Sequence, residues 1–276
     1  MIKAKSASAI GTIDHVVIAV SALAQAKGIY ERLGFTLSPK GVHSAEMGTE
    51  NRTIMLRDDY VELLAVTAPT ERNADWRQVL EQGGGLASMA LRTEDAAAAR
   101  EQWIADGLEP AQAIQFSRPV RRADGSTLEA RFEIVWLPVQ PDMGLGVFVC
   151  QQFTREAVWL PELQVHANTA VAVSRVVLAC PDAERSADQW QRALPGARVR
   201  PTTAGFMVDT GRHTLNLVQQ NVQEVRALGI DFAVTDLRAC SSALVEGEIA
   251  YRDEGARLTV RPEFACNVAI GFEEQI

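Results

Sequence analysis

Apolar residues recur along the chain in the order strand, helix, strands. Residues 12–20 (TIDHVVIAV) form a β-branched apolar run that predicts a buried strand. Residues 22–33 carry apolar side chains at helical spacing until Gly34, a residue type that commonly ends a helix. Three more short apolar runs come next and predict strands: 35–37, 52–56 and 60–66. The first unit is therefore expected to be a βαβββ module.

The same order of elements recurs three more times, which indicates an internal repeat. The second copy places its five elements at 86–92, 94–106, 111–116, 129–137 and 146–152. The third begins at Val173 with VSRVVLAC, which matches IDHVVIAV of the first copy in length and apolar pattern. Its helix and later strands are expected at 183–194, near Phe206 and at 214–219. The fourth is expected at 230–234, 237–245, 250–252, 258–261 and 268–272.

A segment without sustained periodicity, 154–169, separates the second copy from the third. We therefore predict an α+β protein in which four βαβββ modules pair into two halves, each a strongly curved sheet with helices outside. The expected boundaries are 1–155 for the first domain, 156–172 for the connector and 173–276 for the second domain. The alternative is an unrelated two-domain α+β protein whose strand-helix order repeats by chance.

Composition and charge narrow the range of partners. The 276 residues include 47% hydrophobic and 22% charged residues, which is typical of a globular chain. The formal charge of −8 and the lack of a strong basic cluster argue against nucleic acid or an acidic membrane surface as a partner. No apolar stretch is long enough for a signal peptide or a membrane span. Four widely spaced cysteines are expected to be reduced, so we predict a cytoplasmic protein.

Nucleotide-binding and serine-hydrolase motifs are missing from the sequence. There is no G-x-x-x-x-G-K-[ST] loop, no G-x-G-x-x-G after a strand and no G-x-S-x-G elbow. The glycines at 83–85 precede a predicted strand, so they are expected to form a turn and not a phosphate-binding loop. We therefore expect no nucleotide cofactor.

Four βαβββ modules opened by a DHVVIAV strand resemble the vicinal oxygen chelate superfamily. This superfamily includes glyoxalase I, extradiol ring-cleaving dioxygenases and bleomycin-binding proteins. The similarity is sharpest to its glyoxalase-like subgroup, in these stretches: 14–20, 48–51 (GTEN, similar to a G-T-x-N turn), 60–64 and the segment 150–168. The resemblance implies two glyoxalase/dioxygenase-like halves. It does not fix the activity, because one fold hosts many chemistries.

Strand alternation gives this chain a candidate metal pair. His15 shares a strand face with Val17, and Glu62 shares one with Tyr60 and Leu64. If both faces point inward, an imidazole and a carboxylate enter one cavity, where they suit Zn, Ni, Mn or Fe(II). The resemblance implies metal ligands at these two positions, with an ion that holds two vicinal oxygens of a substrate. The alternative for His15 is a core histidine bonded to neighbouring groups.

Further ligands are harder to find. Ser88 stands where the resemblance implies His or Gln, and a serine hydroxyl is a poor ligand. Gln152 is the candidate third ligand, a weak neutral donor at a position that is often His in the glyoxalase-like pattern. A set of His15, Glu62 and Gln152 would resemble a thinned two-His-one-carboxylate site.

The second half is poorer in candidate ligands. Arg175 replaces the equivalent of His15, and Asn216 stands about where a Glu would align. We therefore expect residues 173–276 to be structural or to form a homodimer surface. The alternative is that Arg175 binds an anionic substrate.

Four more residues are candidates for substrate binding: Asn51, Tyr60, Trp136 and His166. Tyr60 and Trp136 would line the cavity as aromatic walls, Asn51 would orient a substrate oxygen, and His166 would reach in from the connector. The simpler alternative is packing for the two aromatic residues and turn stabilisation for Asn51. The two other histidines, His43 and His213, lie next to turns and are expected to be exposed to solvent.

These features leave two functions open. The first is a divalent-metal-dependent enzyme acting on a small oxygenated substrate by lyase, isomerase or dioxygenase chemistry, in which Glu62 is able to take a proton. The second is a metal-free protein of the bleomycin-resistance type that binds or sequesters a small molecule in the same cavity.

Overall fold

The first half of the protein contains the two expected βαβββ modules and one extra helix. The computed structural model describes residues 8–122, 125–138 and 140–275. The elements of the first half are β1 (Ile13–Ala19), α1 (Leu23–Arg32), β2 (Gly41–Val42), β3 (Thr49–Met55), β4 (Tyr60–Val66), the short 3-10 helix η1 (Glu71–Asn73), α2 (Ala74–Glu81), β5 (Gly85–Thr93), α3 (Ala96–Ala105), β6 (Ile114–Arg121), β7 (Thr127–Leu137) and β8 (Gly146–Gln152).

The second half repeats the same order. After α4 (Arg155–Val158) and the 3-10 helix η2 (Pro161–Leu163), its elements are β9 (Ala170–Cys180), α5 (Ala183–Ala193), β10 (Arg198–Thr202), β11 (Gly205–Asp209), β12 (Thr214–Gln219), β13 (Arg226–Val234), α6 (Leu237–Glu246), β14 (Tyr251–Asp253), β15 (Arg257–Val260), the 3-10 helix η3 (Pro262–Phe264) and β16 (Ala269–Glu274). No helix among the described residues is both long enough and apolar enough to cross a membrane.

Each half forms one eight-stranded mixed sheet. The strand orders are β2-β3-β4-β1-β5-β8-β7-β6 and β10-β11-β12-β9-β13-β16-β15-β14. In both sheets the first strand of each module pairs parallel with the last strand of that module, and the two first strands pair antiparallel in the centre. The α+β class, with four βαβββ modules in two halves, is therefore confirmed.

The predicted strand at 35–37 is wrong. The second strand of the first module is β2, which lies further along the chain and has only two residues. Phe35 is instead buried against the ring of Phe232 in the second half, with 4.8 Å between ring centroids. This short apolar run fills the core and pairs with no strand, a distinction that periodicity cannot make in so short a segment.

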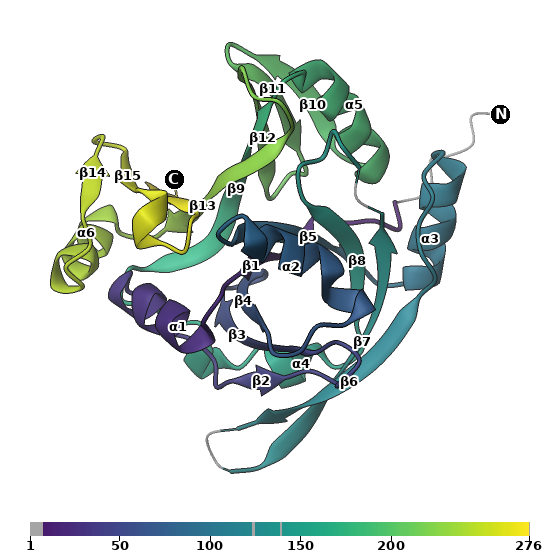
Figure 1. Ribbon diagram of the computed structural model, residues 1–276. Coiled ribbons are helices and arrows are strands. Elements are labelled where there is room, and N and C mark those ends of the chain that lie inside the picture. Colours follow the sequence, from purple (N-terminus) through teal and green to yellow (C-terminus); the bar gives the residue numbers. More distant parts are fainter. Residues whose placement is uncertain (1–7, 123–124, 139, 276) are drawn as a thin grey trace.

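The first sheet curls until its two edge strands, β2 and β6, lie next to each other. In Figure 1 the strands of this sheet surround a central region over which α2 lies. The strand faces that point inward carry one apolar cluster, and the opposite faces contribute to a second cluster shared with the helices and with the other half. The curl of the sheet is therefore what encloses a cavity.

The two halves share a continuous apolar core. Trp103 of α3 is fully buried, and its Nε1 donates to the carbonyl oxygen of Ala193 on α5 at 3.0 Å. The contact of Phe35 with Phe232 joins the halves at another point of the same core. The second half therefore packs directly behind the sheet that forms the cavity.

Candidate functional site

The cavity lies inside the curled first sheet and has a volume of about 50 Å³. Six of its fifteen wall residues are aromatic: Tyr60, Trp76, Phe116, Phe132, Trp136 and Phe148. Five other side chains bring nitrogen or oxygen to the wall: His15, His43, Asn51, Glu62 and Arg118. An apolar pocket with a few convergent polar groups is the usual form of a small-molecule site.

His15 and Glu62 face each other in this cavity, as strand alternation predicts. In the parallel pair of β1 and β4, His15 lies opposite Tyr60, and Glu62 lies opposite Val17. The residues are 3% and 8% exposed, and His15 Nε2 lies 3.9 Å from Glu62 Oε2. The ring of Tyr60 stacks on His15 with 4.3 Å between centroids. The imidazole therefore has a fixed orientation toward the carboxylate.

A β-bulge places Asp14 beside His15. The register between β1 and β5 shifts between Ile13 and His15, so Asp14 has no strict partner on β5. Its Oδ2 lies 2.9 Å from His15 Nδ1. Burial alone would raise the pKa of Asp14, but the hydrogen bond and charge of His15, together with Arg92, hold that pKa below its usual value. Strand alternation alone places Asp14 on the opposite face from His15, so the bulge changes the site.

Gln152, predicted as the third metal ligand, does not line the cavity. Its Nε2 donates to Asp14 Oδ2 at 2.7 Å, while Arg92 Nε donates to the other carboxylate oxygen at 3.2 Å. Gln152 Oε1 is buried and has no hydrogen-bond partner in the part of the chain that the structure describes. Gln152 therefore holds Asp14, which in turn holds His15.

His43 belongs to the cavity, and the prediction that it is exposed is wrong. Its side chain is 8% exposed, and its Nε2 lies 3.9 Å from Glu62 Oε1. The pKa of His43 is lowered by burial and by the nearby Arg118, with Glu62 acting in the opposite direction. His43 Nδ1 lies 2.7 Å from the hydroxyl of Thr49, which fixes the ring. The GTEN turn at 48–51 is the sequence signal that could have indicated this, because it supplies Thr49.

Asn51, a predicted substrate-binding residue, lies between His43 and Glu62. Its Nδ2 donates to Glu62 Oε1 at 2.5 Å and lies 3.3 Å from His43 Nε2. His15 thus faces one carboxylate oxygen of Glu62 and His43 faces the other. The oxygen that faces His43 also accepts the hydrogen bond from Asn51. Trp136, the other aromatic candidate, lines the cavity beside Phe148, with 4.3 Å between ring centroids.

His166, the remaining substrate-binding candidate, is not brought to the cavity. Its Nδ1 accepts from the backbone nitrogen of Thr36 at 3.0 Å, and its Nε2 donates to the carbonyl of Met55 at 2.9 Å. With one ring nitrogen as acceptor and the other as donor, the ring is neutral, and burial lowers its pKa. Both nitrogens therefore hold the connector to the first half.

The donor set does not fit a three-ligand metal site. Ser88 Oγ accepts from Trp76 Nε1 at 3.3 Å, and Gln152 is bonded to Asp14. Within the described ranges, no three or more His, Cys, Asp or Glu side chains are arranged to hold a metal ion. Of the ligands expected from the sequence, His15 and Glu62 remain, fewer than the three that catalytic zinc and non-haem iron sites take from the protein.

The sequence profile of the Glyoxalase-like domain matches residues 13–194, which is more than half of the chain. The chain belongs to this glyoxalase-like family. A search of curated proteins returned no match. The resemblance to the vicinal oxygen chelate superfamily is thereby confirmed at the level of family and fold.

Solved structures show the same fold at low identity to this glyoxalase-like protein. A hypothetical protein from Staphylococcus aureus is 13% identical, with a TM-score of 0.71 over 96% of this chain and 99% of that one. A mutant of 4-hydroxymandelate synthase from Streptomyces coelicolor is 13% identical, with a TM-score of 0.62 over 96% and 92%. A variant of homoprotocatechuate 2,3-dioxygenase from B. fuscum is 16% identical, with a TM-score of 0.59 over 98% and 73%. At these identities the similarity concerns the fold alone.

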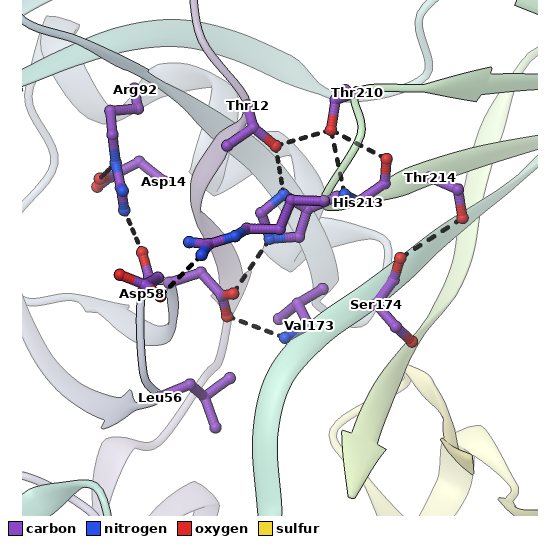
Figure 2. Close-up of polar contacts among 12 residues, drawn as sticks. Thr12, Asp14, Leu56, Asp58, Arg92, Val173, Ser174, Thr210, His213 and Thr214 are labelled. Atoms are coloured by element: carbon purple, nitrogen blue, oxygen red, sulfur yellow. Dashed lines mark hydrogen bonds and ion pairs between the residues drawn. The ribbon is translucent and has the colours of Figure 1, made fainter. Parts of the chain in front are cut away.

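The second half of the glyoxalase-like protein contacts the turn that leads into the cavity wall. His213 is fully buried, so the prediction that it is exposed is wrong. Its Nε2 lies 3.1 Å from Asp59 Oδ2 and its Nδ1 lies 2.5 Å from the hydroxyl of Thr12 (Figure 2). The other oxygen of Asp59 accepts from the backbone nitrogen of Val173 at 2.9 Å. Asp59 directly precedes Tyr60, so these bonds support the strand that carries Tyr60 and Glu62.

The equivalent of His15 in the second half, Arg175, is engaged by acidic residues of its own sheet. Arg175 NH1 lies 2.6 Å from Asp231 Oδ2 and 2.9 Å from Glu273 Oε1. Burial alone would lower the pKa of Arg175, but Glu273 and Asp231 raise it. The guanidinium of Arg175 is therefore already paired with carboxylates. This pairing counts against the alternative that Arg175 binds an anionic substrate.

Proposed function

We propose that this glyoxalase-like protein is an enzyme that moves a proton on a small oxygenated substrate, with Glu62 as the catalytic base. The observation that carries the proposal is the position of Glu62, a buried carboxylate between two imidazoles in an aromatic cavity. A carboxylate held in one position inside a cavity is a suitable general base, because it is already placed to take a proton from a bound substrate. Isomerase and lyase chemistry both begin with such a step.

The groups around Glu62 have distinct roles in this proposal. Asp14 accepts from His15 Nδ1, so the ring presents Nε2 to the cavity. In that tautomer Nε2 carries no proton, so it would accept a hydrogen bond from a substrate hydroxyl and orient the substrate, while Glu62 takes the proton from the adjacent carbon. Asn51 holds Glu62 in place between the two rings. The aromatic walls exclude water and hold a planar substrate.

A divalent ion such as Zn, Ni, Mn or Fe is not given a step in this proposal. Of the ligands expected from the sequence, the cavity holds His15 and Glu62, whereas Ser88 and Gln152 are bonded to other partners. Metal analysis of protein purified without added metal tests this point, and a stoichiometric ion would contradict it.

Deuterium exchange tests the proposed proton transfer. The protein is incubated in D₂O with a panel of small 2-oxo acids and hydroxy ketones, and exchange at the carbon next to the carbonyl is followed by NMR. Glu62→Gln should slow exchange by roughly 100-fold or more, because an amide cannot accept the proton. Glu133→Gln is the matched control, since Glu133 bonds Gln115 and is absent from the cavity wall. Equal rates for wild type and Glu62→Gln would contradict the proposal.

The second candidate function is a metal-free binding protein. It is favoured by the six aromatic residues of the cavity wall, which suit stacking on a planar ligand without any chemistry. Saturable binding of a panel compound without exchange at any carbon would support this function over the enzyme.

A further inference from the structure

Arg118 of β6 is a cation of the cavity wall that has no partner within the described chain. The guanidinium groups of other arginines near the site are occupied: Arg92 bonds Asp14, Arg52 bonds the carbonyl of Ser38, and Arg155 bonds the carbonyl of Asp58. Arg118 is half-buried and lines the cavity, yet no hydrogen bond or salt bridge joins its guanidinium to another described residue. A half-buried charge without a partner is costly, so an anionic ligand would find it available.

The guanidinium of Arg118 lies near Asn51, at the place where β2 faces β6. A Cβ added to Gly41 of β2 would lie 3.3 Å from Arg118 NH1 and would collide with Asn51 Oδ1. Arg118 also acts electrostatically on His43 and on Tyr60. The absence of a side chain at Gly41 therefore lets Arg118 and Asn51 approach the same point of the cavity, close to Glu62.

Arg118 also lines a second hollow, the outer groove, which lies beside β2 and β6. This outer groove continues past β6 over the apolar side chains of Pro119, Val120, Leu160 and Leu163. Arg118 is the residue that the cavity and the outer groove have in common. A group bound to it would thus lie at the mouth of the cavity, with the rest of the ligand inside.

We propose that the substrate is an aryl-substituted monocarboxylic acid whose carboxylate binds Arg118. This inference rests on the proposed function for the position of the reacting carbon, which must lie beside Glu62. Among the described wall residues, the charges of one arginine and one carboxylate cancel, so a singly charged ligand leaves less unpaired charge in the cavity than a phosphate dianion would. The planar fork of an arginine matches a carboxylate with two parallel hydrogen bonds.

The aromatic side chains of the cavity wall suit the aromatic ring of such a ligand. Phe116 and Phe132 are stacked with 5.1 Å between centroids, and Trp136 lies 4.3 Å from Phe148. Phe116 is two residues from Arg118 on the same strand, so the two side chains share the inward face of β6. A ring packed against Phe116 would place an attached carboxylate within reach of Arg118.

The test is a binding titration of the whole protein with phenylacetate, phenylacetamide and phenyl phosphate, followed by tryptophan fluorescence. Trp76 and Trp136 line the cavity and report its occupancy. We expect phenylacetate to bind roughly tenfold or more tighter than its neutral amide, as a hydrogen-bonded charge pair requires, and tighter than phenyl phosphate. Equal binding of acid and amide, no saturable binding of the acid, or tighter binding of the phosphate would each overturn the inference.

Variants separate the role of Arg118 from effects on folding. Arg118→Gln should lose the preference for the acid and keep the affinity for phenylacetamide, which shows that the cavity is intact. Arg131→Gln on β7 is the matched control, since Arg131 is exposed and absent from the wall, and should bind both compounds as wild type does. An unchanged preference in Arg118→Gln would overturn the assignment.

The binding titration and the deuterium exchange experiment can fail independently of each other. Glu62→Gln should still bind phenylacetate, because it removes a like charge from the cavity and leaves Arg118 in place. Binding through Arg118 without any exchange would leave the carboxylate site standing and the proposed proton transfer refuted. Exchange without any preference for the acid would support the proton transfer and refute the carboxylate site at Arg118.

Discussion

Asp14 does not line the cavity, but it determines how the ring of His15 is presented to the cavity. A buried carboxylate needs hydrogen bonds on both oxygens, and here His15, Arg92 and Gln152 supply them. In return, Asp14 fixes which nitrogen of His15 carries the proton and which faces Glu62. One carboxylate thus links the position of the imidazole to the ends of β5 and β8.

Replacing Asp14 should impair catalysis more than stability. Asp14→Asn is expected to slow the deuterium exchange by roughly tenfold or more, because an amide no longer selects one tautomer of His15. Asp95→Ala is the control, since it removes the N-cap of α3 away from the cavity and should cost about 1 kcal/mol of stability. Exchange rates are compared per folded protein, with folding measured by urea unfolding. A rate for Asp14→Asn equal to that of the control would contradict the role given to Asp14.

After η2, the connector between the halves is held in place by side-chain bonds and not by regular structure. Thr36 donates from its hydroxyl to the carbonyl of Val165, and Asn168 Nδ2 donates to the carbonyl of Leu33. His166 adds the bonds to Thr36 and Met55. The connector is thereby fixed to the end of α1 and the end of β3, which explains how a segment without periodicity keeps one path.

His166 should make the stability of the protein depend on pH. Its pKa is lowered in the folded state from the usual value of 6.5, so as the pH falls the unfolded chain takes up a proton first. The free energy of unfolding should therefore decrease as the pH falls from about 7.5 to about 5.5, and His43, whose pKa is also lowered, adds in the same sense. Urea unfolding across this range should show a shallower slope for His166→Gln. An unchanged slope would count against this account.

At the scale of the whole molecule, the two halves have the same topology but different contents. The first sheet encloses the cavity, whereas the corresponding position of the second carries the ion pairs of Arg175 with Asp231 and Glu273. The second half also contributes His213 to the turn that precedes Tyr60. The half that encloses the cavity therefore depends on contacts made by the other.

The contact of His213 with Asp59 should matter for the stability of the whole chain. His213→Leu is expected to lower the free energy of unfolding by about 3 kcal/mol, because it leaves the buried carboxylate of Asp59 without its imidazole partner. In the His213→Leu variant, Asp59→Asn should lower the free energy of unfolding by less than it does in the wild type, because the two side chains are in contact. Arg212→Gln, which removes an exposed ion pair to Asp58, should cost less than about 1 kcal/mol. Additive losses for His213 and Asp59 in urea unfolding would refute the coupling.

The sequence predicts those features of the fold and the site that depend on local geometry. The period of two along a strand is enough to place His15 and Glu62 on inward faces, and the repeated apolar pattern is enough to give the module order. The sequence could not place Asp14, because a bulge depends on the partner strand, nor His43, whose burial depends on the curl of the whole sheet. The place given to Gln152 rests on analogy of position, and such analogy does not show its hydrogen bond to Asp14.

The shared core sets the smallest piece of this protein that can keep the cavity intact. A fragment ending at residue 155 would keep every described wall residue of the cavity, but it would expose Phe35 and Trp103 to water. The family profile extends to residue 194 and so includes Ala193, whose carbonyl accepts from Trp103. Engineering of the cavity, or transfer of it to another scaffold, must therefore carry both halves together.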